Sequence, residues 1–350
     1  MALNLLRNFD SELVELTCGR GSVLIPPKLH GRIFCQFDGE LIHRLDAAAL
    51  LNPSPDQYDN FGGNSLWPAP EGGPFAFNYL PGGDAWTVQD GIGKAIPSVS
   101  CDDGITALVE KHITITNRKG FVIHLGYRRL VSVPDGNCVP QGYDLNGLSY
   151  RTEDIFEPLG DYNTEDVLLA PWSLEQFPGA EGILAFGKVG EESDALNCDF
   201  YGQPGDRIAL AQGQFTFRLG GDQRQQIGVR VSSRPRLIGA LDLPRSMLFL
   251  RKTQPQEGLY FNIADNDQAT GPFSAADLYS IFNGGDLGFF ELETVGAMRV
   301  IEGRVAVSTL PSETVILKGS TEELLRYLSE QEGVRIAESV PSYPCGAGPA

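Results

Sequence analysis

Short segments in which apolar and polar residues alternate are the main pattern of this chain. The clearest is Leu108–Thr116, where valine and isoleucine share one face of an expected strand and His112 lies with other polar residues on the opposite face. A turn at Asn117–Gly120 separates this segment from Phe121–Leu130. The two segments therefore predict a β-hairpin.

Similar segments recur along most of the chain, separated by clusters of Gly, Pro, Asp and Asn. Many short strands between such turns are typical of an all-β sandwich. The other expected strands are Ser22–Pro26, Arg32–Phe37, Glu40–Leu45, Phe75–Tyr79, Val167–Phe177, Gly182–Val189, Gln214–Leu219, Ile227–Val231, Ser246–Arg251, Leu259–Ala264, Leu278–Phe282, Leu287–Val295, Arg304–Leu310 and Thr314–Lys318.

Two stretches interrupt this pattern and are expected to lack regular structure. Phe61–Pro74 reads FGGNSLWPAPEGGP. Its prolines and paired glycines suit a stiff, ordered loop better than a central strand. Such a loop could hold Trp67 and Glu71 in fixed positions, or it could simply place Trp67 in the core. Residues 134–165 are rich in Gly, Pro, Asp and Asn and predict a long connection.

One helix is predicted near the end of the chain. Ser320 and Glu323 have the spacing of a capping box, an apolar stripe follows, and Gly333 ends it. We therefore expect a sandwich domain over residues 1–318, followed by a C-terminal helix and a flexible tail over residues 319–350.

Composition narrows the possible partners. The formal net charge is −18, which argues against binding to nucleic acid or to anionic membranes. No apolar run approaches the ~20 residues of a membrane span, and acids interrupt the N-terminal stretch where a signal peptide would be apolar. We therefore expect a cytoplasmic protein. Its six cysteines contain no CxxC pair and are expected to be free thiols.

No motif indicates a cofactor or a metal. The chain has no complete GxGxxG, no GxxxxGK[ST], no HExxH and no GxSxG sequence. Asp265–Asp267 resembles the start of a calcium loop, but the glycine that such a loop requires is missing. Neither a cofactor nor a metal site is therefore predicted.

A pair of glutamates stands out in the expected strand Leu287–Val295. Strand parity places Phe289, Glu291, Glu293 and Val295 on one face, with the two carboxylates roughly 7 Å apart. If that face is solvated, both are ordinary surface acids. Because it also carries apolar residues, partial burial and mutual repulsion would raise their pKa values and suit one of them to acid–base catalysis.

Four segments together resemble the galactose mutarotase-like (aldose 1-epimerase-like) superfamily, in branches that carry WPAPE and FELET signatures. They read RIFCQFDGELIHR, GGNSLWPAPEGG, APWSLEQF and FNGGDLGFFELETVGA, and the resemblance extends over roughly residues 20–318. It implies a β-supersandwich of large antiparallel sheets with a sugar bound on a concave face. The expected ligand is a monosaccharide or the end of an oligosaccharide.

The resemblance also implies catalytic roles. The family's LETQ-type motif places its general base at Glu293, and Glu291 could accept a hydrogen bond from a sugar hydroxyl. A histidine protonates the ring oxygen in true mutarotases, but this chain lacks the NHxYFN-type segment that supplies it. Of its four histidines, His112 is the best placed by strand parity. Lys252 is one alternative acid.

The expected substrate-binding residues carry aromatic, amide or charged side chains that suit sugar rings and hydroxyls. They are Trp67, Glu71, Arg32, Arg128, Trp172 and Gln176, of which Glu71 and Arg128 are also alternative acids, and Trp86 is a further aromatic candidate. The leading interpretation is a carbohydrate-binding protein, in which any reaction would be aldose 1-epimerase-like acid–base chemistry at an anomeric carbon with Glu293 as the base. The alternatives are a catalytically silent sugar-binding module, and a hydrolase or lyase with Glu71 as its second acid.

Overall fold

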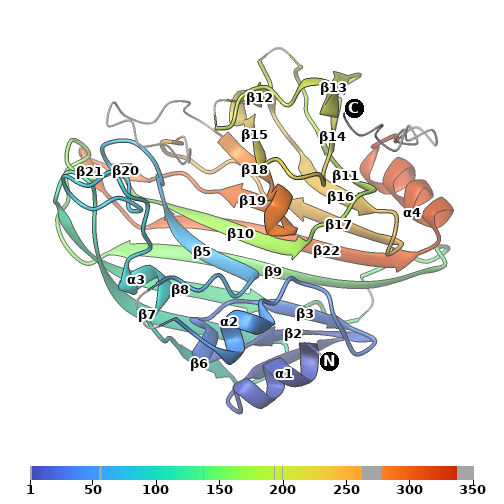
Figure 1. The fold of residues 1–350 in the computed structure, drawn as a ribbon, viewed down its shortest axis with the longest axis horizontal. Helices are drawn as coiled ribbons and strands as arrows, with labels where there is room; N and C mark the ends of the chain where they lie inside the picture. Colours follow the sequence, from blue (N-terminus) through green and yellow to red (C-terminus); the bar gives the residue numbers. More distant parts are fainter. Residues whose placement is uncertain are drawn as a thin grey trace, which may run out of the picture.

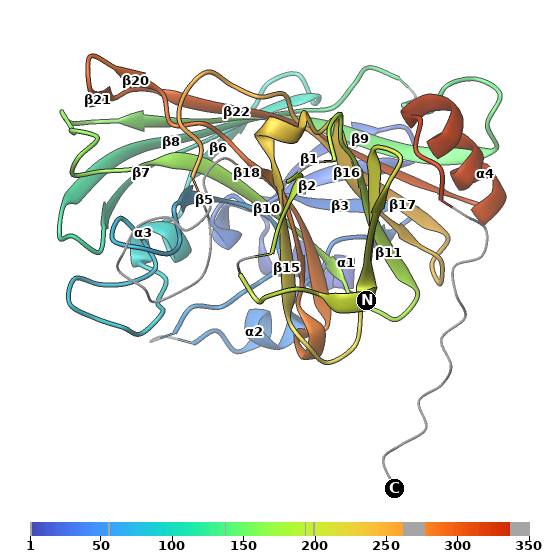
Figure 2. The same cartoon turned by 90° about the horizontal axis from the view of Figure 1, so that it is seen from above.

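The structure, a computed structural model, describes residues 2–54, 57–136, 138–192, 194–198, 200–261 and 277–336. Its largest element is an antiparallel sheet, in which strands β9 and β22 extend across most of the molecule (Figures 1 and 2). In spatial order, its ten described strands are β13 (Ile208–Ala211), β14 (Gln214–Arg218), β11 (Ile183–Lys188), β16 (Leu237–Asp242), β17 (Met247–Lys252), β22 (Ser308–Gly319), β9 (Leu145–Pro158), β8 (Val122–Ser132), β7 (Thr106–Thr116) and β6 (Ser98–Cys101).

A second antiparallel sheet packs face to face on the first. Its six described strands, in spatial order, are β12 (Leu196–Asn197), β15 (Gln225–Arg230), β18 (Asp277–Asn283), β19 (Phe289–Val295), β10 (Ala170–Pro178) and β5 (Gly63–Ala69). Strands β10 and β19 contact β9, β17 and β22 of the larger sheet. The prediction of an all-β supersandwich of large antiparallel sheets is confirmed.

Smaller elements pack around this sandwich (Figure 1). The remaining strands are β1 (Val14–Cys18), β2 (Gly21–Ile25), β3 (Phe34–Phe37) and β4 (Glu40–Leu41), which form one sheet, and the pair β20 (Val300–Ile301) and β21 (Arg304–Val305). Helices α1 (Ala2–Phe9) and α2 (Ala47–Leu51) lie near the four-stranded sheet, and α3 (Asp90–Gly93) lies beside β7. These three helices were not predicted.

The predicted C-terminal helix is present as α4 (Thr321–Tyr327), followed by a π-helical turn at Leu328–Glu332. Ser320 caps its first turn by accepting a hydrogen bond from the Glu323 backbone N–H at 3.2 Å, and Gly333 ends it with φ of 64°. Leu324 and its apolar neighbours pack on β17 and β22. No helix in the described part of the chain is both long and apolar enough to cross a bilayer.

The space between the two sheets holds a buried polar network as well as apolar side chains. On β10, Glu175 accepts hydrogen bonds from Tyr150 (2.6 Å), Thr314 (2.8 Å) and His43 (2.8 Å), and it pairs with Arg251 at 3.3 Å. Burial acts to raise the pKa of Glu175, but Arg251 and His43 outweigh it and lower that pKa to about 2. Glu175 is therefore ionised at neutral pH inside the sandwich.

Strand parity on β10 separates this network from the opposite face of the smaller sheet. Ser173 and Glu175 point toward the ten-stranded sheet, whereas Trp172, Leu174 and Gln176 point away from it, to a cleft. Both faces of β10 are buried, because one face packs on the larger sheet and the other lines the cleft. The functional groups described below lie on the face that points away.

The two stretches expected to lack regular structure both contain strands. Phe61–Pro74 includes β5, which is tolerated there because β5 is the edge of its sheet and Pro68 lies opposite Pro171. Residues 134–165 include β9, between β22 and β8. The pattern of a strand was not recognised here because the inward face of β9 carries polar residues. One of them, Asp154, forms an ion pair with the fully buried Arg129 at 2.7 Å.

Several smaller predictions have mixed outcomes. Phe75–Tyr79 forms turns and not a strand, and half of Leu259–Ala264, all of Asp265–Asp267 and the tail beyond residue 336 lie outside the described residues. The five described cysteines are free thiols. Cys345 lies outside the described residues.

Candidate functional site

A cleft of about 230 Å³ lies on the face of the six-stranded sheet that points away from the larger sheet. It is lined by side chains from β5, β10, β15, β18 and β19 and from the segments around them. The residues that line it are Tyr58, Asn60, Ser65, Trp67, Glu71, Trp86, Trp172, Leu174, Gln176, Tyr201, Arg224, Gln226, Phe282, Leu287, Phe289, Glu291 and Glu293.

Glu291 and Glu293 lie together in this cleft, on the face of β19 that parity predicted. In the antiparallel pairing with β10, Glu291 is opposite Gln176 and Glu293 is opposite Leu174. Glu291 is 7% exposed and Glu293 is completely buried. The apolar strand face therefore keeps both carboxyl groups away from bulk water.

Each carboxyl group is held by hydrogen-bond donors from neighbouring strands. Gln176 Nε2 donates to Glu291 Oε1 at 2.7 Å. Trp172 Nε1 donates to Glu293 Oε2 at 2.9 Å, and Gln226 Nε2 donates to Glu293 Oε1 at 3.2 Å. These contacts fix the orientation of both side chains.

The electrostatic environment keeps at least one proton on this pair near neutral pH. Burial raises the pKa of Glu291 to about 7, although the Gln176 hydrogen bond and the charges of Arg44 and Arg32 act against it. Burial and the charge of Glu291 raise the pKa of Glu293 well above the ordinary carboxyl range. Two buried carboxyl groups with one proton between them are a recognised acid–base arrangement.

Arg44, just after β4, is a site residue that sequence reasoning missed. Its Nη1 donates to Gln176 Oε1 at 3.3 Å, and its guanidinium lies over the Phe289 ring at 4.8 Å. The contact with Arg44 orients the Gln176 amide, so that its nitrogen points to Glu291. Arg44 is the last residue of the segment RIFCQFDGELIHR, but nothing in that segment indicated the cleft.

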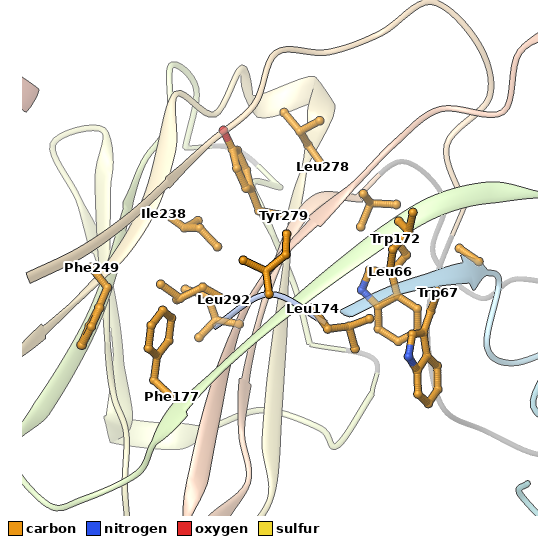
Figure 3. Close-up of a cluster of buried hydrophobic side chains, with 14 of the residues drawn as sticks. Leu66, Trp67, Trp172, Leu174, Phe177, Ile238, Phe249, Leu278, Tyr279 and Leu292 are labelled. Carbon is orange, nitrogen blue, oxygen red and sulfur yellow. The ribbon is translucent and has the colours of Figure 1, made fainter. Parts of the chain in front are cut away.

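Aromatic rings form one wall of the cleft. Trp67 and Trp172 face each other across β5 and β10, with ring centroids 6.1 Å apart and nearly perpendicular planes (Figure 3). Trp86 stacks on Trp67 at 6.4 Å, and Tyr58 meets Trp67 edge-on at 5.5 Å. Trp67 is 7% exposed and Trp86 is 42% exposed, so Trp86 presents the open aromatic surface.

Glu71 also lines the cleft, as the sequence suggested. It lies two residues after the end of β5 and is 9% exposed. Trp86 Nε1 donates to Glu71 Oε1 at 2.7 Å. This hydrogen bond holds Glu71 against the aromatic wall and brings a third carboxyl group to the same cleft.

The remaining predicted residues lie elsewhere. His112 and Arg128 line a separate surface cavity over β7 and β8, where Arg128 pairs with Glu157 at 3.2 Å. Lys252 lines a cavity of about 790 Å³ on the ten-stranded sheet and pairs with Glu332 at 2.6 Å. The positions of His112, Arg128 and Lys252 therefore do not support the expectation that one of them is the acid that works with Glu293. Parity assigned His112 to the correct strand face, but that face belongs to the other sheet.

Arg32 lies behind the cleft and not in its lining. It donates to the Gly62 carbonyl at 2.7 Å and to the Tyr58 hydroxyl at 2.5 Å, so it supports Tyr58 from outside. All four histidines are among the described residues, and none of them lines the cleft. The described residues contain no cluster of three or more His, Cys, Asp or Glu that could hold a metal ion.

The chain belongs to a family of unknown function, DUF6786, whose profile matches residues 1–340. No curated protein matches the chain. Among solved structures, it resembles a candidate aldose 1-epimerase from Escherichia coli K12, with a TM-score of 0.50 and 12% identity over 87% of this chain and 98% of that one.

Two further solved structures are similar. One, from Synechocystis sp. PCC 6803, has a TM-score of 0.50 and 13% identity over 87% of this chain and 95% of that one. The other is a galactose mutarotase-like protein from Lactobacillus casei ATCC 334, with a TM-score of 0.48 and 11% identity over 87% and 98%. The likeness to the two structures with a TM-score of 0.50 shows that the fold is galactose mutarotase-like (aldose 1-epimerase-like). At this identity, the likeness shows the fold alone.

Proposed function

We propose that this protein binds a saccharide in the cleft and catalyses proton transfer at its anomeric carbon. The observation that carries the proposal is the buried Glu291–Glu293 pair beside the Trp67–Trp172–Trp86 wall. A carbohydrate-related function also agrees with the fold, which is shared with a candidate aldose 1-epimerase.

The cleft suits one sugar ring by size and chemistry. Its volume of about 230 Å³ is below the range of about 300–1,000 Å³ that drug-sized ligands occupy. Indole faces stack on the apolar face of a pyranose, and carboxylates and amides bind its hydroxyls. One ring, either free or at the end of a longer saccharide, is the ligand that matches these features.

The proposed reaction interconverts anomers. The glutamate pair takes the proton of the anomeric hydroxyl as the bond from C1 to the ring oxygen breaks, leaving its electron pair on that oxygen. Glu71, a third carboxyl group in the cleft, protonates the ring oxygen to give the open-chain aldehyde. Closure on the other face of the carbonyl reverses both proton transfers, so that no proton is gained or lost overall.

A binding panel tests the proposal before any kinetics. Calorimetric titration of the purified protein with several aldoses and short oligosaccharides should show saturable binding of at least one of them. The same titration of Trp86→Ala should show weaker binding, whereas Phe121→Ala, an exposed aromatic just before β8 of the ten-stranded sheet, should bind like the wild type. Binding of none of the sugars, or equal affinity of Trp86→Ala, would contradict the proposal.

A further inference from the structure

We propose that Glu291 is the base of the cleft, and that Glu293 keeps its proton and donates it in a hydrogen bond to Glu291. The resemblance to mutarotases had placed the base at Glu293. The inference rests on the proposed function for one point, namely that the proton which Glu291 accepts comes from a sugar. The protonation states of the two carboxyl groups can be measured without any sugar.

Position along β19 is the first argument. The residues of its cleft face run from the mouth of the cleft to its floor. Leu287, just before the strand, is 42% exposed, Phe289 is 6% exposed, Glu291 is 7% exposed and Glu293 is 0% exposed. Glu291 is therefore the first carboxyl group of the pair that a ligand in the cleft meets.

The hydrogen-bond partners are the second argument. Trp172 and Gln226 occupy both oxygens of Glu293, and Gln226 is itself anchored by donating to Ser280 Oγ at 2.8 Å. Apart from Glu293, Gln176 is the one donor group that reaches Glu291 at hydrogen-bond distance within the described residues. Glu291 thus keeps acceptor capacity for a ligand hydroxyl, whereas Glu293 has little left.

Charge around the pair is the third argument. Arg44 and Arg32 both favour the ionised form of Glu291, and a hydrogen bond from Glu293 favours it further. Tyr58 also faces Glu291, and burial raises the pKa of its hydroxyl, so it stays neutral. Phe282, opposite Glu291 on β18, is apolar.

Glu293 has the opposite surroundings. Arg251 reaches it only weakly from the far face of the sheet, where it pairs with Glu175. Burial and the charge of Glu291 outweigh the hydrogen bonds from Trp172 and Ser280, so the pKa of Glu293 is raised well above the ordinary carboxyl range. A single negative charge on the pair is therefore best placed on Glu291. Glu293 acts as a positioning residue.

Replacement of each glutamate by glutamine separates the two assignments. Glutamine resembles a protonated carboxyl group, since it has one acceptor oxygen and a donor nitrogen. Glu293→Gln should therefore preserve the hydrogen bond to Glu291, whereas Glu291→Gln removes the base. Glu157→Gln, on the ten-stranded sheet, is the matched control.

The direct readout is carboxyl NMR of protein with ¹³C-labelled glutamate side chains, titrated from acid to alkaline pH. Glu291→Gln should remove a resonance that titrates near neutral pH, and Glu293→Gln should remove one that stays protonated throughout that range. The reverse assignment would overturn the inference, whether or not the protein acts on a sugar. Circular dichroism and urea unfolding confirm that both variants are folded.

The kinetic readout is anomer exchange of a sugar that the wild type accelerates. Glu291→Gln should lose about 100-fold or more of the enzymatic rate, whereas Glu293→Gln should keep it within about fivefold with an unchanged pH midpoint. A loss in Glu293→Gln as large as in Glu291→Gln, with sugar affinity retained, would return the base to Glu293. If the wild type accelerates the anomer exchange of none of the sugars, the proposed reaction is wrong. The carboxyl NMR spectra then still determine the protonation states of Glu291 and Glu293.

Discussion

Trp172 donates its indole N–H to Glu293 Oε2 at 2.9 Å, from one strand of the smaller sheet to the next. The indole is therefore part of the support of the carboxyl pair, in addition to being part of the aromatic wall. Its role differs from the sugar-stacking role expected from the sequence, since Trp172 is only 2% exposed.

Trp172→Phe should destabilise the protein, because phenylalanine keeps a six-membered aromatic ring but has no indole N–H. The variant leaves Glu293, a buried acceptor, without the hydrogen bond from the indole N–H, and this loss lowers the free energy of unfolding by about 1–3 kcal/mol. Urea unfolding of both proteins measures this loss. Trp86→Phe, on the exposed rim, should change the free energy of unfolding by less than about 1 kcal/mol. Equal stability of Trp172→Phe and the wild type would show that the indole N–H does not support Glu293.

Trp86→Ala should weaken sugar binding and leave the fold intact. Trp86 is the exposed ring of the wall, and loss of an aromatic face in a binding site costs about 1–2 kcal/mol, or about tenfold in affinity. Calorimetry with the tightest-binding sugar measures the change. Unchanged affinity would mean that the sugar does not reach the Trp86 face.

The unfolding free energy should depend on pH through Glu291. Its pKa in the folded protein is about 7, above the ordinary 4.5, so the folded state holds a proton that the unfolded chain has released. This contribution to stability is complete below pH 4.5, declines as pH rises toward 7 and is then constant, with a total of at most about 3 kcal/mol.

Comparison with Glu291→Gln reports that contribution, because buried groups that do not interact with Glu291 titrate alike in both proteins. The wild type should lose stability relative to Glu291→Gln between pH 4.5 and 7, with no further change above that range. Urea unfolding at several pH values measures the difference. Parallel profiles for the two proteins would show that Glu291 has an ordinary pKa.

The buried network on the other face of β10 predicts a large effect of Glu175→Gln. The change leaves Arg251 without its charge partner inside the sandwich, and breaking a buried pair costs about 3–5 kcal/mol. The exposed pair Arg151–Glu313 is the control, and Glu313→Gln should cost less than about 1 kcal/mol. Similar losses in both variants would mean that the buried network contributes no more than a surface pair.

Local patterns predicted the parts of the structure that depend on local chemistry. Period-2 alternation located β7 and β8, the capping box located α4, and strand parity placed Glu291 and Glu293 on one face. Each of these features is determined by a few neighbouring residues.

Pairings between distant residues could not be predicted in the same way. The inward polar residues of β9 find buried partners such as Arg129 on β8, and β5 tolerates prolines because it lies at an edge. Arg44 reaches the cleft through Gln176, 132 positions away in the chain. His112 has the correct parity, but its strand lies in the other sheet. Only the packing of the two sheets decides these cases.

The most direct test of the proposed function is two-dimensional exchange NMR of α and β anomers, run over a panel of aldoses with the wild-type protein and with Glu291→Gln. The account predicts that the wild type accelerates the exchange of at least one aldose above the rate in buffer, and that Glu291→Gln reduces it to the buffer rate. Binding of a sugar without acceleration of any anomer exchange would contradict the catalytic claim and indicate a silent sugar-binding module.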